Sequence, residues 1–468
     1  MKTRGKMAKA VLVMGFLALI APGLAAAQQP TIKVNCDKGE SVQSALDRLT
    51  GPATIVVTGT CNENVVIKKD DVSLQGGTYD ASDPARDTIL VQGARRVAIT
   101  SVTVTGGLNG VVAYQGGSLT LENSLIKTNT EKGVVAVYGS SVTVHSSTIQ
   151  DNTLQGVLVN DNSALVLTNC TITRNHAAGV LVQRSSSARI GQKMGGGSGP
   201  NTITNNGGAG VNVSRSAYAL IDGNTITGNS GNGINIEGAS VTVTNNTIAN
   251  NQIKGITVHD SANARIGITE GDQPGPNTIE NNVFEGIEIS NSGAAHIWAN
   301  RIRYNGQTTY RPGVGIYRAT GHLIGDNTIQ ENGGHGVTVN QGAFLQGKGD
   351  FFDLTPGPDI ITQNVYSGIS GWNGASLDIR NATITDNDQN GVSLGLHSTL
   401  RIYGSTVSWN YHGIWVYQGS AVIFGTPAAS ITNNSVWGVL CDDKESSLAG
   451  DTSGVTSNTR GNVSCTGF

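Results

Sequence analysis

Short runs in which apolar and polar residues alternate recur along most of this chain. In one unit, Gly233 is followed by Ile234 and Ile236, and then by Val241 and Val243. A period of two over so few residues predicts short β-strands, and these units show no period of 3.6 residues. The Asn, Gly and Ser residues between the runs favour tight turns. Each unit is therefore predicted to form three short strands joined by turns, which is one coil of a parallel β-helix.

The units follow one another at a nearly constant spacing. A Gly before Val or Ile marks each unit, at Gly110, Gly133, Gly156, Gly179, Gly210, Gly233, Gly255, Gly286, Gly315, Gly336, Gly368, Gly391, Gly413 and Gly438. Most intervals are 22 or 23 residues. Repeats of this length predict a solenoid, in which each coil contacts only its neighbours.

Insertions interrupt the same point of every third coil, at 188–203, 264–279, 343–361 and 421–431. They are predicted to form a row of loops on one edge of the rod. Such loops could wall a groove, or they could be tolerated insertions that mark a duplicated three-coil block.

An Asn stands three residues after the apolar position of each "NTI" element. The series consists of Asn129, Asn152, Asn175, Asn206, Asn229, Asn251, Asn282, Asn305, Asn332, Asn364, Asn387, Asn410 and Asn434. Stacked coils would place these side chains about 4.8 Å apart. Amides at that spacing can bond to one another and to turn backbone that would otherwise be buried without partners. We predict a structural Asn ladder.

The two ends of the chain differ from the repeat. Residues 1–27 hold a basic start, the apolar run AVLVMGFLALIA and three Ala before Gln28, which predicts a secretory signal peptide cleaved after Ala27. The segment SVQSALDRL at 41–49 predicts a short amphipathic helix with Ser41 as its N-cap. We therefore expect a signal peptide at 1–27, an N-terminal cap at 28–64, the β-helix at 65–440 and a C-terminal cap at 441–468.

The five cysteines support the same division. An exported chain meets an oxidising compartment, so we predict the local disulfides Cys36–Cys61 and Cys441–Cys465 around the caps. Cys170 falls in a turn position that other coils fill with Ser or Asn, and we predict a buried free thiol there. The expected location is secreted, periplasmic or at the cell surface.

The net charge of the chain limits the classes of partner that it can bind. Residues 1–27 carry four of the 30 Lys and Arg and no acidic residue, so the remaining chain has 26 against 33 Asp and Glu, a net charge of −7. No basic tract remains, which argues against nucleic acid. An acidic glycan would need local Arg residues or a bridging cation such as calcium. No other metal or cofactor is indicated, no segment is long enough to span a membrane, and the oligomeric state stays open.

The N-T-I-x-x-N and G-[VI]-x-[VI] elements resemble those of the right-handed parallel β-helix, or pectate-lyase-like, superfamily from about Val65 to Gly438. The resemblance implies an all-β, right-handed parallel β-helix. The Gly anchors and the helix expected at 41–49 add the prediction of roughly 14–16 coils with a helical N-terminal cap. Members include polyuronate lyases, galacturonases, alginate epimerases, adhesins and phage tailspikes, which typically act on long acidic glycans laid across the rod. One such fold serves many chemistries, so the resemblance says more about fold than activity.

No specific catalytic signature of that superfamily is found in the sequence. Gly334-His335-Gly336 matches one element of the galacturonases, but no NTD or DD element precedes it. His335 stands just before the strand Gly, a position that Lys254 and Glu285 hold in other coils. The mixed residues of this column predict a solvated turn.

The second and fourth residues after each column Gly are expected to point outward, and in the middle of the chain they become polar. Glu237 and His259 fall in one column about 5 Å apart, and Glu288 lies one coil further, shifted by two residues. Carboxylates beside an imidazole can exchange protons, so these three are the candidate catalytic residues. Side chains that could hold a uronate or cover a sugar ring are the candidate substrate-binding residues: Arg184, Arg215, Asp260, Tyr317, Arg318, Trp372, Trp415 and Tyr417.

These patterns predict an exported β-helix protein that recognises an extracellular or envelope polysaccharide along an outer groove. Cleavage or C5-epimerisation of that polymer is the catalytic hypothesis. The alternative is a non-catalytic surface or structural module, such as an adhesin or a scaffold.

Overall fold

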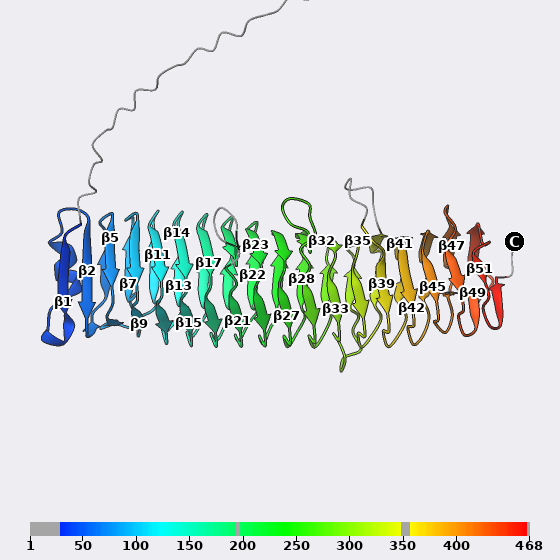
Figure 1. The fold of residues 1–468 in the computed structure, drawn as a ribbon, viewed down its shortest axis with the longest axis horizontal. Coiled ribbons are helices and arrows are strands. Elements are labelled where there is room, and N and C mark those ends of the chain that lie inside the picture. The colour runs from blue at the N-terminus through cyan, green and yellow to red at the C-terminus, as the bar shows by residue number, and fades with distance from the viewer. Residues whose placement is uncertain (1–28, 193–196, 198, 348–355, 466–468) are drawn as a thin grey trace, which may run out of the picture.

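The computed structural model describes residues 29–192, 197, 199–347 and 356–465, which form a straight rod of stacked coils (Figure 1). The signal peptide expected at 1–27 lies outside the described residues. Sheet A has 18 strands, from β1 (Thr31–Asn35) to β50 (Ser447–Gly450). At the usual strand spacing the rod is roughly 80 Å long. The all-β, right-handed parallel β-helix is confirmed, with about 18 coils rather than the expected 14–16.

Each coil runs once through three parallel sheets. One coil consists of β23 (Tyr218–Asp222) in sheet A, β24 (Thr225–Thr227) in sheet B and β25 (Ile234–Glu237) in sheet C. Sheet C carries the residues after each column Gly. Its strands are β4 (Val65–Ile67), β7 (Ile89–Gln92), β10 (Val111–Tyr114), β13 (Val134–Ala136), β16 (Val157–Val159), β19 (Val180–Val182), β22 (Val211–Ser214), β25, β28 (Ile256–His259), β31 (Ile287–Ser290), β34 (Val314–Tyr317), β37 (Val337–Asn340), β40 (Ile369–Trp372), β43 (Val392–Gly395), β46 (Ile414–Val416), β49 (Trp437–Cys441) and β52 (Gly461–Ser464).

The additional coils lie at the two ends of the repeat. β2 (Ala53–Thr58) and β3 (Thr60–Asn62) precede residue 65 and pair with the sheets of the rod. After residue 440, β50, β51 (Val455–Thr456) and β52 pair with β47 (Ala421–Phe424), β48 (Ser430–Thr432) and β49. Asn64 and Thr88 stand where Gly precedes the later strands of sheet C. The Gly marker therefore could not reveal the first coils.

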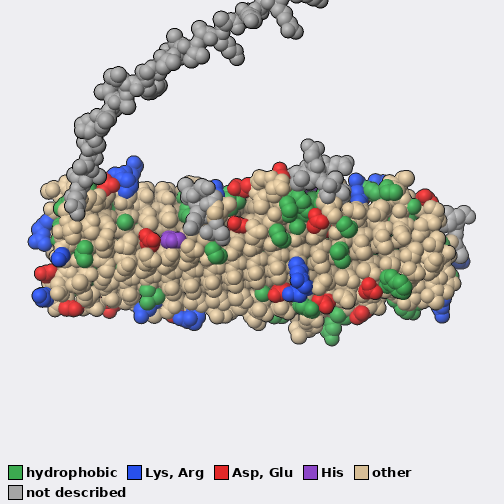
Figure 2. All heavy atoms as spheres, in the orientation of Figure 1, with side chains coloured by type: hydrophobic (Ala, Val, Ile, Leu, Met, Phe, Trp, Pro, Cys, Tyr) green, Lys and Arg blue, Asp and Glu red, His purple; other side chains and the backbone are tan. Residues whose placement is uncertain are grey.

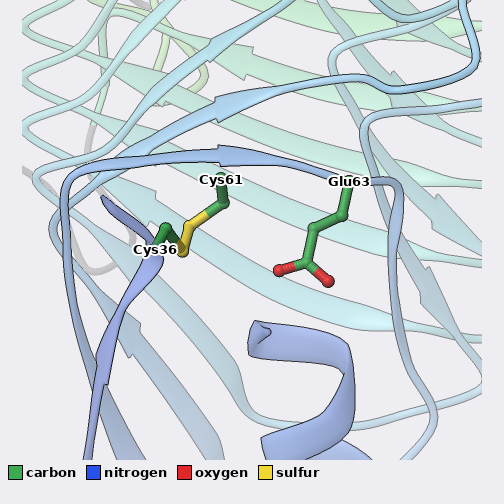
Figure 3. A group of neighbouring side chains, drawn as sticks. All are labelled: Cys36, Cys61 and Glu63. Carbon is green, nitrogen blue, oxygen red and sulfur yellow. A yellow bond between two sulfur atoms is a disulfide. The ribbon is translucent and has the colours of Figure 1, made fainter. Parts of the chain in front are cut away.

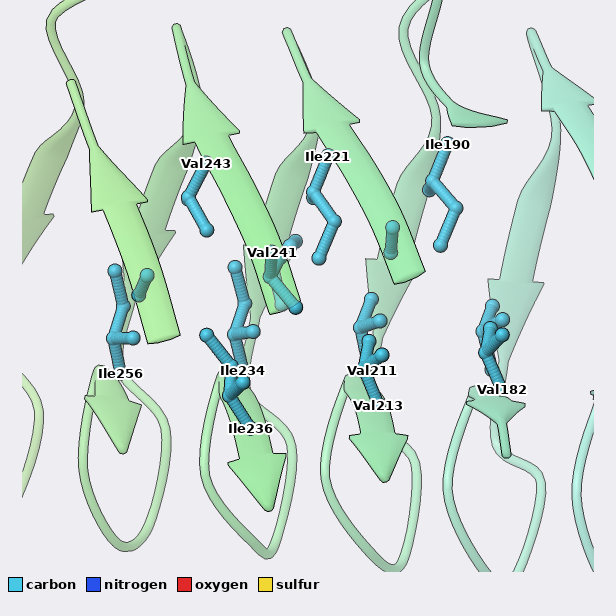
Figure 4. Close-up of a cluster of buried hydrophobic side chains, with 14 of the residues drawn as sticks. Val182, Ile190, Val211, Val213, Ile221, Ile234, Ile236, Val241, Val243 and Ile256 are labelled. Atoms are coloured by element: carbon cyan, nitrogen blue, oxygen red, sulfur yellow. The ribbon is translucent and has the colours of Figure 1, made fainter. Parts of the chain in front are cut away.

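The core is a continuous column of aliphatic side chains inside the three sheets. In the middle of the rod, Ile234 and Ile236 of sheet C meet Val241 and Val243 of β26 (Ser240–Thr244) in sheet A, and all are almost fully buried (Figure 4). Their burial on alternate positions explains the period of two in the sequence.

The Gly column is required by close contact between coils. A Cβ added to Gly233 would lie 2.7 Å from the carbonyl oxygen of Gly255 and 2.5 Å from Cγ2 of Ile248. Any larger residue would push neighbouring backbones apart, so the repeat retains Gly at this turn.

One coil departs from the predicted marker. The backbone N–H of Ile287 donates to the carbonyl of Gly313 at 2.9 Å, and Val314 is the register partner of Ile287. Gly313 therefore occupies the column, and the assignment of Gly315 to it was wrong. Gly315 instead faces outward, in register with Glu288. Both Gly residues precede Val or Ile, and only the stacking of the coil distinguishes them.

The predicted Asn ladder is confirmed. The backbone N and Nδ2 of Asn229 both donate to Oδ1 of Asn251, at 3.1 and 3.0 Å, and Asn206 bonds to Asn229 in the same way. The bonds connect all thirteen predicted residues, which are buried, and continue from Asn434 to Asn458. Asn458 was not predicted, because no NTI element precedes it.

A second ladder runs along the turn between sheets A and B. It consists of Asn201, Asn224, Asn246, Asn277, Asn300, Asn327 and Asp359, linked through the same pair of bonds to Oδ1 of the next coil. The Asn that begins each NTI element indicates this second ladder, which was not predicted from the sequence. Asp359 ends the ladder, since Ala382 holds the position in the next coil.

A short helix packs against the first coils. α1 (Val42–Asp47) begins after Ser41, whose side-chain oxygen accepts a hydrogen bond from Ser44 N at 3.1 Å, as expected of an N-cap. Val42, Ala45 and Leu46 of α1 are buried in the core cluster. A single-turn 3-10 helix, η1 (Cys36–Lys38), precedes it. No helix among the described residues is long and apolar enough to cross a membrane.

Both predicted disulfides are formed. Cys36 bonds to Cys61 beside α1, and Cys441 bonds to Cys465 at the last coil. Cys170 is a buried free thiol whose Sγ donates to the carbonyl of Thr168 at 3.1 Å, and burial raises its pKa to about 11. A thiol in this state has a structural role, as predicted.

Candidate functional site

The outer face of sheet C changes character along the rod. Its first coils present an apolar stripe formed by Leu90, Val112, Val135, Leu158 and Leu181. From β22 onward the same column becomes polar, with Asn212, Asn235, Thr257 and Glu288 in successive coils. Charged residues make up only 13% of the chain, and Figure 2 shows how sparse they are on one side of the rod. A local group of charges on sheet C is therefore a distinct feature.

Glu237 and His259 are register partners on β25 and β28, as the sequence predicted. His259 Nδ1 lies 3.0 Å from Oδ2 of Asp260, and its Nε2 lies 3.2 Å from Oδ1 of Asn235. Both ring nitrogens are thus held, and Asp260 is the group that orients the imidazole.

Glu288 lies on the next strand but faces a different partner. Its register neighbour is Thr257 rather than His259. One carboxylate oxygen forms an ion pair with Lys254 Nζ at 2.5 Å, and the other accepts from Ser290 Oγ at 3.0 Å. The side chain of Glu288 is only 15% exposed, so this ion pair is largely shielded from solvent.

A second carboxyl, Glu285, lies two residues before β31, where the charges of Lys254 and Glu288 act on it. It is 2% exposed, and its Oε2 has no hydrogen-bond partner among the described residues. Burial raises the pKa of Glu285, against the weaker opposing effect of nearby cations such as Lys254 and Arg311. Arg311 Nη1 is 3.9 Å from Oε1, too far for a tight pair. The buried position favours the protonated acid.

Tyr317 contacts Glu285, and its OH donates to Oε1 at 3.5 Å. A Cβ on Gly315 would lie 2.6 Å from Cε2 of the Tyr317 ring and 2.8 Å from its OH. The missing side chain at Gly315 therefore lets the ring fold back across the strand. Burial, followed by the charge of Glu285, raises the pKa of Tyr317, so the phenol stays protonated at neutral pH. We call Lys254, Glu285, Glu288 and Tyr317 the acid–base cluster.

Three of the four predicted aromatic residues come together further along the same face. The rings of Trp415 and Tyr417 stack at 4.3 Å between centroids, and Trp372 meets Tyr417 at 5.5 Å. Trp372 and Tyr417 pack across Gly395, where an added Cβ would lie 2.4 Å from the indole. Here too, a Gly in the outward column makes room for aromatic rings.

The remaining predicted binding residues follow the turn at the end of the sheet C strands. Arg184, Arg215, Asp260 and Arg318 all have positive φ and are exposed. Arg184 is 3.5 Å from Asp161, and Arg318 Nη2 donates to Asn291 at 2.8 Å. These side chains line one edge of the outer face of sheet C.

The column before the Gly is solvated only in some coils, so the prediction fails for part of it. Partly exposed members are Lys132, Gln155, Asn232, Lys254 and His335. Glu285, Asn390 and His412 are buried in this column. His335 Nδ1 accepts from Ser367 N at 3.1 Å, and burial lowers the pKa of His335 to about 4. His412 accepts from Trp437 N in the same way at 3.3 Å. These histidines link coils, and the sequence reading missed Lys254 and Glu285 because it treated their column as solvent.

The insertions leave the rod at the turn between sheets A and B. β20 (Ser187–Ile190) and β21 (Thr202–Thr204) flank the first insertion, and β29 (Asn263–Ile266) and β30 (Thr278–Glu280) flank the second. The second loop, at 267–277, projects from the upper edge of the rod in Figure 1. The described parts of these loops therefore do not wall the outer face of sheet C. The third insertion is described only in part, since 348–355 lie outside the described residues.

The sequence matches the family described as "Right handed beta helix region" over residues 54–193 and 199–352, more than half of the chain. The chain belongs to this right-handed β-helix family. No curated protein matches the sequence.

Several solved structures of β-helix proteins are similar in fold. The mannuronan C-5 epimerase A-module of Azotobacter vinelandii is 18% identical, with a TM-score of 0.45, and the match covers 78% of this chain and 94% of that chain. An alginate lyase from a Paenibacillus species is 14% identical, with a TM-score of 0.37 and coverage of 62% and 98%. A double mutant of a periplasmic alginate epimerase is 13% identical, with a TM-score of 0.35 and coverage of 79% and 77%. At these levels the likeness concerns the β-helix fold alone.

One group in the described part of this β-helix has the spacing of metal ligands: Cys36, Cys61 and Glu63 (Figure 3). The two sulfurs are bonded to each other, and Glu63 accepts from Ser41 Oγ at 2.9 Å and Val42 N at 2.7 Å at the start of α1. This carboxylate stabilises the helix N-terminus. In sheet C, Glu288 pairs with Lys254, and Glu285 lies 3.9 Å from Arg311.

Proposed function

We propose that the chain is an exported protein that binds a polysaccharide along the outer face of sheet C and acts on its uronate units at the acid–base cluster. The observation that carries the proposal is Glu285, a buried carboxyl with a raised pKa that contacts Tyr317 next to the Lys254–Glu288 ion pair. Titratable groups pushed toward different protonation states are typical of sites that move protons. The disulfides support an oxidising location outside the cytoplasm.

The proposed chemistry begins with removal of the proton next to the uronate carboxylate. His259 is the proposed base through Nε2, once the substrate displaces Asn235 Oδ1 from it, while Asp260 holds Nδ1. Glu285 with Tyr317 is the proposed acid. In a lyase the C5–H and C4–O bonds break, a C4=C5 double bond forms and the acid protonates the leaving oxygen. In an epimerase the proton returns to C5 from the opposite face. Lys254 offers a cation for the substrate carboxylate, and Trp372, Trp415 and Tyr417 extend the binding surface.

The test is a screen of polyuronates and neutral polymers with and without a chelator, in heavy water. The wild type is expected to incorporate deuterium at C5 or to form unsaturated ends. Glu285→Gln retains a neutral side chain of the same shape but cannot transfer a proton, so turnover should fall by roughly 100-fold or more while polymer binding remains. Glu280→Gln is the matched control, because Glu280 pairs with Arg303 in sheet B.

The outcomes separate the possible functions. Binding by the wild type without any turnover would favour the non-catalytic surface or structural module. Turnover that persists in Glu285→Gln would remove Glu285 from the chemistry. Loss of binding or turnover when the chelator is added would indicate a bridging calcium ion, which the negative net charge of the chain suggests for an acidic glycan.

A further inference from the structure

A separate cleft of 520 Å³ opens near the C-terminal end of the rod. Its lining includes Asp388, Tyr411, His412, Trp415, Leu440 and Asp442. It lies where the turns between sheets B and C meet β46 and β49. Because β46 is five strands beyond β31, the cleft is about 24 Å from Glu288.

Aromatic rings form the walls of this cleft. The Tyr411 side chain is 54% exposed, and its ring meets His412 edge-on at 4.7 Å. Trp415 is supported by the stacked ring of Tyr417. Exposed rings that neighbours hold in place lose little entropy on binding, and their flat faces suit the C–H face of a sugar.

The polar groups of the cleft match hydroxyl groups. Asp388 and Asp442 are exposed carboxylates at its rim, and such groups accept hydrogen bonds only. His412 Nδ1 accepts from Trp437 N, which leaves the ring proton of the neutral imidazole on Nε2 as a donor. Burial is the main cause that lowers the pKa of His412, with a further contribution from Arg460, so this ring is neutral at pH 7.

The charge of the lining disfavours acidic sugars. No Lys or Arg lines the cleft in the described part of the chain, and two carboxylates do. A uronate, sulfate or phosphate group would meet Coulomb repulsion from both. Hydroxyls of an uncharged sugar can instead donate to these carboxylates.

We propose that this cleft is a second glycan-binding site, which takes an uncharged hexopyranose unit. It rests on the proposed function only in that the ligand is a carbohydrate, and it needs no chemistry at the acid–base cluster. A polymer engaged at both sites would carry neutral sugars about 24 Å from its uronate units.

The test uses the full chain with neutral oligosaccharides of glucose, mannose or galactose and with oligouronates of the same length. Saturation-transfer NMR identifies binding, and calorimetry measures affinity. At least one neutral series is expected to bind, and Tyr411→Ala should weaken it by about tenfold through loss of the ring face. Tyr138→Ala is the control, since Tyr138 is 57% exposed on a distant coil. The double variant Asp388→Asn with Asp442→Asn should weaken neutral-sugar binding and reduce the discrimination against oligouronates.

The proposal is overturned if no neutral oligosaccharide binds the wild type. It is also overturned if binding is unchanged in both Tyr411→Ala and the double Asn variant, because the ligand would then lie elsewhere. Uronate turnover is measured separately. Its absence would count against the acid–base cluster and would not affect the test of neutral-sugar binding in the cleft.

Discussion

Asp359→Asn is expected to stabilise the rod above neutral pH and to have little effect in acid. Asp359 is 2% exposed, and its Oδ1 accepts from the backbone N and Nδ2 of Asn327 at 3.2 and 2.8 Å. Burial raises the pKa of this carboxyl from the ordinary 3.8 to about 7, although the bonds from Asn327 act in the opposite direction. An Asn at this position keeps the accepting oxygen and cannot ionise.

The direction of this pH dependence follows from proton linkage. A carboxyl whose folded pKa lies above its unfolded pKa binds a proton more tightly in the fold, so ionisation disfavours the fold. The free energy of unfolding is therefore unaffected by Asp359 below about pH 4, decreases as pH rises from about 4 to 7, and stays at the reduced value above. A pKa rise from 3.8 to about 7 corresponds to a loss on the order of 4 kcal/mol.

The assay is a series of urea denaturation curves between about pH 4 and pH 8 for the wild type and the variant. The difference between their midpoints should widen with pH and reach its limit just above pH 7. Asp388→Asn serves as the control, since Asp388 is exposed and its variant should show no such trend. A midpoint difference that does not change with pH, or a variant that is less stable at about pH 8, would refute the reasoning.

Three further predictions concern the ladder, the Gly column and the acid. Asn229→Ala should lower the free energy of unfolding by about 1–3 kcal/mol because its ladder partners lose their bonds, whereas Asn160→Ala on the outer face should change it by less than about 0.5 kcal/mol; equal denaturation midpoints would contradict this. Gly233→Ala should prevent normal stacking and lower the melting temperature, while Gly271→Ala, with no atom within 4 Å of the added Cβ, should not. If protonated Glu285 is the acid, turnover should decline as pH rises through its raised pKa, and a profile unchanged in Glu285→Gln would exclude that role.

The sequence alone was sufficient for the architecture because each coil repeats the same local demands. Alternating aliphatic residues, a Gly in close contact with the next coil and an Asn that bonds to its copy one coil away recur through most of the rod. Any one coil is ambiguous, but thirteen Asn in succession are not. The disulfides could be predicted as well, since each joins cysteines that lie close in sequence at one end of the rod.

The site was only partly accessible from the sequence. The pairing of Glu237 with His259 followed from counting residues after the Gly, and the structure agrees. The acid–base cluster could not be predicted in this way. Glu285 and Lys254 belong to the column before the Gly, and the burial of that column depends on how neighbouring turns cover it. The position of Tyr317 also depends on Gly315, which the repeat pattern assigned to the wrong column.

Periodic features are determined by the sequence because a stacked coil meets nearly the same surroundings as the coils on either side of it. The exceptions are decided by tertiary structure, since a carboxyl such as Glu285 or Asp359 acquires its raised pKa from the atoms that exclude water around it. Those atoms come from adjacent coils, 22 to 32 residues away in the sequence, and their arrangement exists only once the coils have stacked.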